Sequence, residues 1–253
     1  MRNIKITIEY DGKNFPGWQS QPGKVSIQTE IEKAIHEITG EEVALIASGR
    51  TDAGVHALGQ VANFHTNTKI EISKIPYAIN SKLPNSIVVK DAVEVDERFH
   101  ARYNCKLKTY RYIINNNEFP SALNRYREFH LPYKLNYPDM EKAIKYFEGE
   151  HDFKAFKSSG GNAKKTTVRT LTDCNIKKED GRIYIELTGN GFLYNMVRII
   201  SGTILDVGLG KIKADDIPEI INSGIRERAG RTLPPHGLYL VKVNYEGEDN
   251  GLI

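Results

Sequence analysis

Apolar and polar residues follow regular spacings through the first half of the chain. Residues 3–10, NIKITIEY, alternate so that four apolar side chains fall on one face of an expected strand, namely Ile4, Ile6, Ile8 and Tyr10. After a cap at Ser26, apolar residues recur at helical spacing over 27–38. We expect further strands at 43–48, 59–66 and 86–95 and a short helix at 75–83. The first half therefore predicts the order βαββαβ.

The second half repeats this order. The pattern predicts a strand at 108–115, a helix at 139–148, strands at 172–177 and 182–188, a helix at 193–207 and a last strand at 238–245, with an extra helical turn at 215–221. Two split βαβ units of the ferredoxin-like kind are the simplest interpretation. We therefore predict an α+β fold with units at 1–105 and 106–253, whose antiparallel sheets abut around a central cleft.

Composition narrows the classes of protein that fit this pattern. The 253 residues carry a net charge of +3, from 35 basic and 32 acidic residues, so any nucleic-acid surface must be local. No apolar run approaches the roughly 18 residues that span a bilayer, so we expect no membrane partner and a cytoplasmic location. Cys105 and Cys174 lie in no CxxC pair, which favours structural thiols and predicts no metal site.

Two stretches combine positive charge with a complete lack of acidic residues. Residues 98–117 hold five basic and four aromatic side chains, and residues 153–172 add five more basic side chains around a Ser-Gly-rich segment. Basic residues attract phosphates and aromatic rings stack on bases. A solvated basic face explains either stretch equally well by itself, but two such stretches beside a cleft favour RNA.

The connection 48–56, SGRTDAGVH, is richer in chemistry than a link between strands requires. It lacks the GxSxG pattern of a serine nucleophile, and the chain has no phosphate-binding GxxxxGK loop, while GNGFLY at 189–194 lacks the third glycine of a dinucleotide site. Whether folding brings a second carboxylate near Asp52, as in glycosidases, stays open. Asp52, ionised at neutral pH, is then a nucleophile or a base, with a turn cap as the alternative.

Arg198 lies within the expected helix 193–207, which is apolar over most of its circumference. We therefore expect this guanidinium to be at least partly buried and to need a carboxylate partner, because an unpaired buried charge is costly. Nearby acidic residues are poorly placed, so Asp52 is a candidate. The alternative is that the arginine extends its head group to water.

Several stretches resemble the tRNA pseudouridine synthase A family, in order and over almost the whole chain. They are SGRTDAGVHALGQVANFHT at 48–66, FHARYNCKLKTYRY at 99–112, TVRTL at 167–171, GNGFLYNMVRIISGTILDVG at 189–208 and PPHGLYL at 234–240. The first and fourth are long and specific. The mild departures from the family pattern, such as Asn104 and Cys105, touch no residue with an assigned chemical role.

The resemblance implies a pseudouridine synthase fold and an isomerase that detaches uracil from ribose, rotates it and rejoins it through C5. The expected substrate is tRNA, at anticodon stem-loop positions 38, 39 and 40, with the target base flipped out of the stack. The catalytic aspartate of the family corresponds to Asp52. The base-binding residues correspond to Tyr110, which stacks on the base, Arg198, which pairs with the aspartate, Leu238, which packs under the base, and Arg50, which enters the RNA stack.

The resemblance also supplies expectations about partners. The tRNA-contacting segments correspond to Phe99, His100, Ala101, Arg102 and Tyr103, and to Ser158, Ser159, Gly160, Gly161 and Asn162. A homodimer is expected, with no metal, no nucleotide and no other cofactor. Whether Asp52 attacks C6, attacks C1′ or abstracts a ribose proton stays open, and we expect His56 to support the loop by hydrogen bonding. A non-catalytic RNA-binding protein and an N-glycosidase are the alternative functions.

Overall fold

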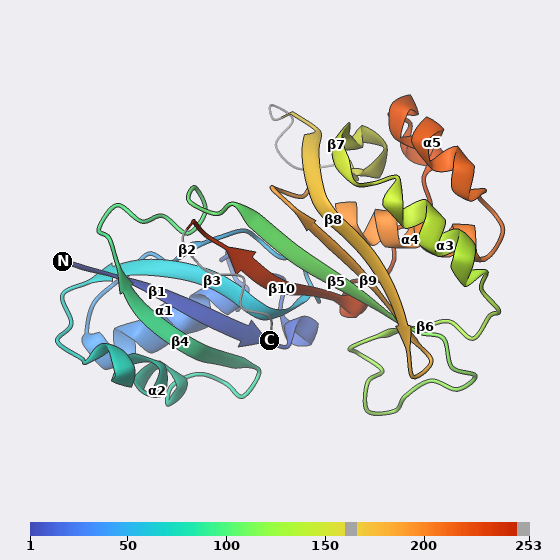
Figure 1. Cartoon of the computed structure of the whole chain (residues 1–253). Coiled ribbons are helices and arrows are strands. Elements are labelled where there is room, and N and C mark those ends of the chain that lie inside the picture. Colours follow the sequence, from blue (N-terminus) through green and yellow to red (C-terminus); the bar gives the residue numbers. More distant parts are fainter. Residues whose placement is uncertain (160–165, 247–253) are drawn as a thin grey trace. The chain divides into compact units, whose positions relative to one another are not determined.

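The computed structural model describes residues 1–159 and 166–246, and its contacts divide the chain into two units. Unit 1 comprises the chain up to Lys106 together with the chain from Tyr239 onward, and unit 2 is Leu107–Leu238. Each unit combines a mainly antiparallel sheet with helices (Figure 1). The predicted α+β class is therefore confirmed.

The sheet of unit 1 is built around two long antiparallel strands. Strand β1 (Arg2–Tyr10) pairs with β3 (His56–Thr66) on one edge and with β4 (Ile87–Val95) on the other. The short β2 (Ile46–Ala47) pairs with β3 on the edge opposite β1. The order β4-β1-β3-β2, all antiparallel, is that of a ferredoxin-like unit, as the sequence pattern predicted. Ile4, Ile6 and Ile8 are fully buried, in agreement with the predicted strand face.

Two helices complete the core of unit 1. Helix α1 (Ile27–Thr39) begins after Ser26, whose side chain accepts from the amide of Thr29, and ends at Gly40 with φ of 73°. The predicted cap at Ser26 is thus confirmed. Helix α2 (Ile75–Asn80) packs against α1 and β4 and buries Ile75 and Ile79.

The last strand forms where the sequence predicted it. We expected a strand at 238–245, and β10 (Leu238–Asn244) is observed there, with contacts that group it with unit 1 from Tyr239 onward. It pairs in parallel with the beginning of β3, where Tyr239 lies opposite His56 and Leu240 opposite Ala57. Alternation thus predicted the strand itself, while the division of the chain into units at 1–105 and 106–253 stays a prediction.

Unit 2 is organised around β5 (Leu107–Asn115), β9 (Arg182–Gly189) and β8 (Val168–Glu179), which are antiparallel neighbours in that order. Two short strands that the sequence pattern did not predict extend this sheet: β7 (Gly149–Asp152) pairs with β8, and β6 (Phe129–His130) pairs with β5. Helix α3 (Tyr137–Lys145) packs against β8 and α4, and α5 (Ile217–Ser223) packs against the turn Phe153–Phe156.

Helix α4 (Met196–Gly208) is the most buried helix of unit 2, because every residue except Arg198 is buried. It begins later than the predicted residue 193, since Asn195 adopts the left-handed conformation with φ of 61° and no helix can continue through it. No helix within residues 1–159 and 166–246 is long and apolar enough to cross a membrane.

Candidate functional site

The loop between β2 and β3 is held at its start by a buried glutamine. Ser48 donates its hydroxyl to the side-chain oxygen of Gln60 at 2.7 Å, and Gln60 donates to the carbonyl of Gly49 at 2.9 Å. The amide of Ser48 also donates to the carbonyl of Val61 at 2.8 Å. Both side chains are fully buried, so the loop leaves β2 from a fixed position.

The next three residues alternate in exposure, as extended backbone requires. Arg50 is exposed, Thr51 is buried and Asp52 is half-buried. The hydroxyls of Thr51 and Tyr10 lie 2.7 Å apart, and the carbonyl of Thr51 accepts from the amide of Trp18 at 3.1 Å. Thr51 thus anchors the segment, while the expectation that Arg50 and Asp52 point to the same side stays a prediction.

A tight turn follows the aspartate. The amide of Val55 donates to the main-chain carbonyl of Asp52 at 3.2 Å, and Gly54 between them has φ of 76°. These features match a type II turn, whose third position strongly favours glycine. The need for Gly54 is therefore conformational, while the expected close approach of RNA to the loop glycines stays a prediction.

The chain that follows β1 supports the loop from the other side. Gly17 pairs with Asp52 in an isolated antiparallel bridge, and Gly17 has φ of 113°. A Cβ on Gly17 would lie 2.7 Å from the carbonyl oxygen of Thr51, so only glycine fits there. The amide of Gly54 also donates to the carbonyl of Phe15 at 3.4 Å. Residues 15–17 are therefore part of the support of Asp52, which the sequence pattern did not indicate.

His56 closes the loop at the first residue of β3. Its Nδ1 accepts from the amide of Gly12 at 3.0 Å, and its ring stacks on Tyr239 with centroids 4.8 Å apart. The ring is 2% exposed. Because this amide requires Nδ1 to be unprotonated, we interpret the Asp11 carboxylate 3.2 Å away as a polar neighbour rather than an ion-pair partner. The prediction that His56 supports the loop by hydrogen bonding is confirmed.

The segment 99–103 is fixed to unit 1 by buried amides. Asn63 on β3 accepts from the amide of Ala101 at 2.9 Å and donates to Asn3 at 2.9 Å and to the carbonyl of Phe99 at 3.3 Å. Tyr245 donates to the carbonyl of Ala101 at 2.7 Å, and its ring lies 5.0 Å from that of Phe99. The segment is thus firmly anchored through Phe99 and Ala101.

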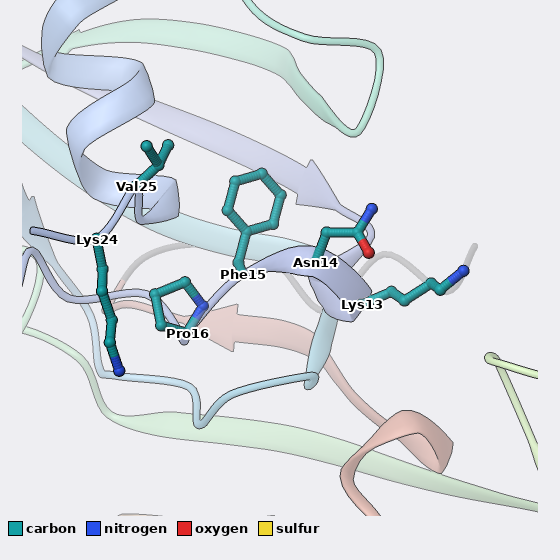
Figure 2. A pocket seen from close by; sticks show the side chains of 6 residues that line it. All are labelled: Lys13, Asn14, Phe15, Pro16, Lys24 and Val25. Carbon is teal, nitrogen blue, oxygen red and sulfur yellow. The ribbon is translucent and has the colours of Figure 1, made fainter.

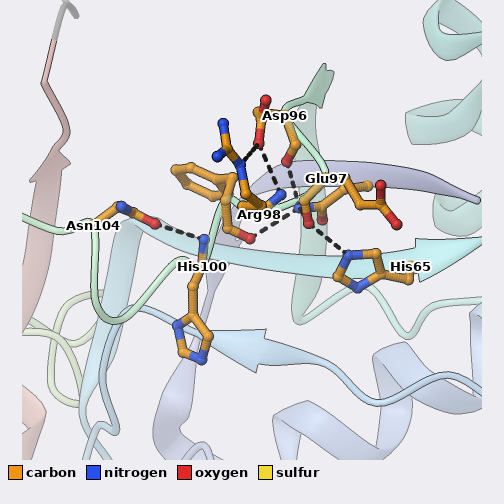
Figure 3. Close-up of polar contacts among 8 residues, drawn as sticks. His65, Asp96, Glu97, Arg98, His100 and Asn104 are labelled. Atoms are coloured by element: carbon orange, nitrogen blue, oxygen red, sulfur yellow. Dashed lines mark hydrogen bonds and ion pairs between the residues drawn. The ribbon is translucent and has the colours of Figure 1, made fainter.

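Between and beyond these anchors, polar and aromatic groups face outward. The rings of His100 and Tyr103 lie 4.2 Å apart, and the guanidinium of Arg102 lies 5.9 Å from the centroid of the Tyr103 ring. Tyr103 is 77% exposed. Figure 3 shows His100 donating its amide to Asn104 and Arg98 pairing with Asp96 beside it. The segment therefore presents a cationic group and aromatic rings to solvent, a combination suited to RNA.

In unit 2, Tyr110 lies on β5 and is 8% exposed. It lies opposite Leu187 of β9 in the strand register. The rings of Tyr110 and Phe192 pack edge to face, with their centroids 5.0 Å apart. This packing fixes the position of the tyrosine ring. Its expected stacking on a base remains a prediction.

Arg198 is half-buried, which confirms the prediction of partial burial. Its Nε donates to the carbonyl of Leu233 at 2.7 Å, and its Nη1 donates to the side-chain oxygen of Asn195 at 2.7 Å. Asn195 in turn donates to the hydroxyl of Ser158 at 2.9 Å. Asn195 therefore links Arg198 to an expected RNA-contacting residue. The carboxylate partner expected for Arg198 stays a prediction.

Leu238 follows a segment that is fixed against β5. Tyr112 donates its hydroxyl to the carbonyl of Pro234 at 2.8 Å, and burial raises the pKa of Tyr112 well above its usual value. A Cβ on Gly237 would come within 2.7 Å of the Tyr112 ring, so this position allows only glycine. Leu238 itself is 6% exposed. Ser159 is exposed, and Gly160, Gly161 and Asn162 lie outside the described residues.

Comparisons with known proteins show the family of this chain. A family model described as tRNA pseudouridine synthase matches residues 6–104 and 143–246. Proteins named tRNA pseudouridine synthase A from Acetivibrio thermocellus and Caldicellulosiruptor saccharolyticus are each 56% identical over 97% of this chain and 100% of the relative. One of the same name from Thermoanaerobacter sp. is 54% identical with the same coverage. A solved structure of a Cbf5-Nop10-Gar1 complex matches 93% of this chain and 57% of that chain, with 12% identity and a TM-score of 0.35.

Proposed function

The chain belongs to the tRNA pseudouridine synthase family and is an isomerase acting on uridine in tRNA, and from this premise we propose that Asp52 is its catalytic carboxylate and that its targets lie in the anticodon stem-loop. The observation that carries the assignment is the anchored segment 50–52. There the buried Thr51, bonded to Tyr10, lies directly before Asp52, which is half-buried. A carboxylate fixed in this way meets the requirement for a positioned anionic group.

The reaction needs no external energy source, because product and substrate are isomers. The bond from N1 to C1′ breaks, the uracil ring turns, and a bond from C5 to C1′ forms. The proton on C5 is lost and N1 takes up a proton. Asp52 can act by addition to C6, by attack on C1′ or by abstraction of a ribose proton. Each route requires the Asp52 carboxylate to contact the uridine. All three routes therefore depend on a loop that holds Asp52 in position.

A uridine within the anticodon stem reaches a carboxylate only when it leaves the helix. Extrusion of a paired base costs on the order of a few kcal/mol. Stacking on an aromatic ring returns about 1 to 3 kcal/mol, and Tyr110 is the ring that we assign to this task. We assign Arg50, which is exposed, to the place that the base vacates in the RNA.

Two further residues complete the proposed base site. Leu238 supplies apolar packing under the uracil ring. Arg198 supplies positive charge to the catalytic carboxylate, and its hydrogen bonds to Leu233 and Asn195 fix the direction of its guanidinium group. Fixed donors cost no reorganisation during reaction, which favours such an arrangement at a catalytic centre.

The proposed tRNA contacts outside the base site are the segment 99–103 and the residues 158–162. The first presents His100, Arg102 and Tyr103 to solvent from an anchored main chain, which supports RNA contact. The second begins at Ser158, which is joined through Asn195 to Arg198. We also retain the family-based expectations of a homodimer, which sedimentation tests, and of action in the cytoplasm.

Release of tritium from tRNA labelled at C5 of uridine tests this function. Isomerisation removes that hydrogen and leaves the mass of unlabelled RNA unchanged. A non-catalytic RNA-binding protein releases no tritium, and an N-glycosidase liberates free uracil, which chromatography detects. We expect tritium release without free uracil.

A further inference from the structure

An open hollow of about 470 Å³ lies at the surface of unit 1, next to the end of β1 and the start of α1. Figure 2 shows the side chains that line it: Lys13, Asn14, Phe15, Pro16, Lys24 and Val25. The volume falls within the range of about 300 to 1,000 Å³ that is common for ligand sites.

One wall of the hollow is the same chain segment that supports the catalytic loop. Phe15 accepts through its carbonyl from the amide of Gly54, and Gly17 pairs with Asp52. Gly12, one residue before Lys13, packs against the main chain of Val55 so closely that a Cβ would collide with its carbonyl. Whatever occupies the hollow therefore lies against the chain segment that supports the proposed catalytic carboxylate.

The side chains around the hollow have the chemistry of a sugar-phosphate site. Lys13 and Lys24 are both exposed and lie at opposite ends of the group, with Phe15 and Pro16 between them (Figure 2). The amide of Asn14 can donate and accept toward a ribose or a base edge. Lysine is a common ligand of phosphate, and aromatic rings receive bases without regard to their identity.

The charge of this segment favours an anionic ligand. No acidic residue occurs between Asp11 and Glu30, a stretch of the chain that contains both lysines. Asp11 itself accepts from the amide of Lys13, which directs its carboxylate toward the main chain of this segment. The segment 12–29 therefore carries a net positive charge, which suits a phosphate-binding surface.

We propose that this hollow binds the sugar-phosphate backbone of tRNA beside the target uridine, with Lys13 and Lys24 on phosphates and Phe15 against a base or ribose. The proposal rests on the proposed function, because it takes tRNA as the ligand and Asp52 as the neighbouring catalytic group. It adds a binding surface that lies in the segment 13–25, outside the expected RNA-contacting segments.

The test measures binding of a fluorescent, unmodified tRNA transcript at several salt concentrations. All variants carry Asp52→Asn, so that binding is read without turnover. Replacing Lys13 and Lys24 together with glutamine should weaken binding by roughly tenfold at 0.1 M salt and lower the slope of log affinity against log salt by roughly 1.5. The loss should be equal for different tRNA sequences, because phosphate contacts carry no base identity.

A matched control removes two other lysines from unit 1. Lys69 and Lys74 are exposed and follow the opposite end of β3 from the catalytic loop, so their joint replacement with glutamine makes the same change in net charge. This control should change affinity by less than about twofold and leave the salt slope unaltered. If the control and the test variant lose affinity equally, or if neither changes the slope, the proposed site is wrong.

Phe15 supplies an independent readout. Phe15→Ala should weaken binding by roughly tenfold without any change in salt slope, and Phe15→Tyr should restore the affinity, because stacking depends on a ring and not on charge. Thermal unfolding of each variant verifies that the fold is retained. The proposed function is tested by a different measurement, the release of tritium by the protein with Asp52 intact. Absence of tritium release would contradict the proposed function, and the salt slopes would still test the binding site on their own.

Discussion

The hydroxyls of Tyr10 and Thr51 lie 2.7 Å apart in the interior of unit 1, one residue before Asp52. Tyr10 is 3% exposed and Thr51 is 6% exposed, so water cannot readily replace either partner. The pair joins the end of β1 to the proposed catalytic loop. Because Thr51 precedes Asp52 directly, this bond sets the position of the carboxylate relative to the sheet.

Tyr10→Phe should therefore lower kcat more than it changes KM for tRNA. The variant keeps the ring but removes one hydroxyl from a buried pair, which costs about 1 to 3 kcal/mol of unfolding free energy. We expect kcat to fall by roughly tenfold, because small displacements of a catalytic group are costly. Steady-state kinetics on tRNA and urea unfolding measure the two effects.

Thr51→Val supplies the control for this pair. It removes the other hydroxyl with little change of shape, so the double variant should lose little more stability than either single variant. A coupling energy of about 1 kcal/mol in the double-mutant cycle is expected. Strict additivity of the two losses would show that the bond between Tyr10 and Thr51 does not fix the loop.

Asn63 should control tRNA binding without touching RNA. Asn63→Ala removes the acceptor for the amide of Ala101 and the donors to Asn3 and Phe99. We expect faster hydrogen exchange at the amide of Ala101 and a loss of tRNA affinity of roughly fivefold, because the segment 99–103 loses its anchor. Amide exchange and binding titrations measure the two outcomes.

Asn80→Ala is a matched control for Asn63. Asn80 also bonds main-chain groups in both directions, since it donates to the carbonyl of Val89 at 2.9 Å and accepts from its amide at 2.8 Å. It supports β4 and not the segment 99–103. The control should lose stability as well, by about 1 to 3 kcal/mol, while keeping its affinity for tRNA. Equal losses of affinity in both variants would argue against an anchoring function of Asn63.

Asn195 offers a way to separate backbone strain from hydrogen bonding. Asn195→Gly keeps access to its φ of 61° but removes the amide that binds Arg198, whereas Asn195→Ala also strains the backbone. Both variants should lower kcat, by roughly tenfold, because the guanidinium of Arg198 loses a fixed partner. Only Asn195→Ala should show the additional loss of about 1 kcal/mol in unfolding free energy. Full activity of the glycine variant would exclude a positioning function of the amide.

Buried tyrosines predict a loss of stability at alkaline pH. Burial raises the pKa of Tyr10 and of Tyr112 above the ordinary value of 10.0. The folded protein therefore keeps both protons when the unfolded chain releases them, so the stabilisation is complete below pH 10 and falls as the pH rises further. The slope should be about 1.4 kcal/mol per pH unit for each tyrosine.

Urea unfolding at pH 8, 10 and 11 measures this dependence. Tyr112→Phe has no proton to retain at that position, so its loss of stability between pH 10 and 11 should be smaller than that of the parent protein by about 1 kcal/mol. Identical slopes in the two proteins would show that Tyr112 ionises normally in the folded state.

Regular periodicity allowed most elements to be predicted from the sequence. Ser26 with the apolar spacing of 27–38 predicted a helix that is observed at Ile27–Thr39. Two strands were missed because alternation needs several residues to be visible, and β6 has only two residues while β7 reads GEHD.

The site was predictable where a residue conflicts with its surroundings, and not where its function depends on the folded main chain. Arg198 stood out as a charge within an apolar helix, and its partial burial followed. Asn195 and Gly17 did not stand out, since their importance comes from positive φ values that appear only in the structure. The support of the loop by Phe15 likewise depends on a main-chain contact, which side-chain pattern cannot show.

The central claim, that Asp52 is the catalytic carboxylate of a tRNA uridine isomerase, is tested most directly by carbodiimide mapping of pseudouridine. A tRNA transcript is treated with the protein or with its Asp52→Asn variant, and modified positions are read at nucleotide resolution. We predict pseudouridine in the anticodon arm with the parent protein and none with Asp52→Asn, which should still bind the transcript. Pseudouridine formed at an undiminished rate by Asp52→Asn would contradict the account.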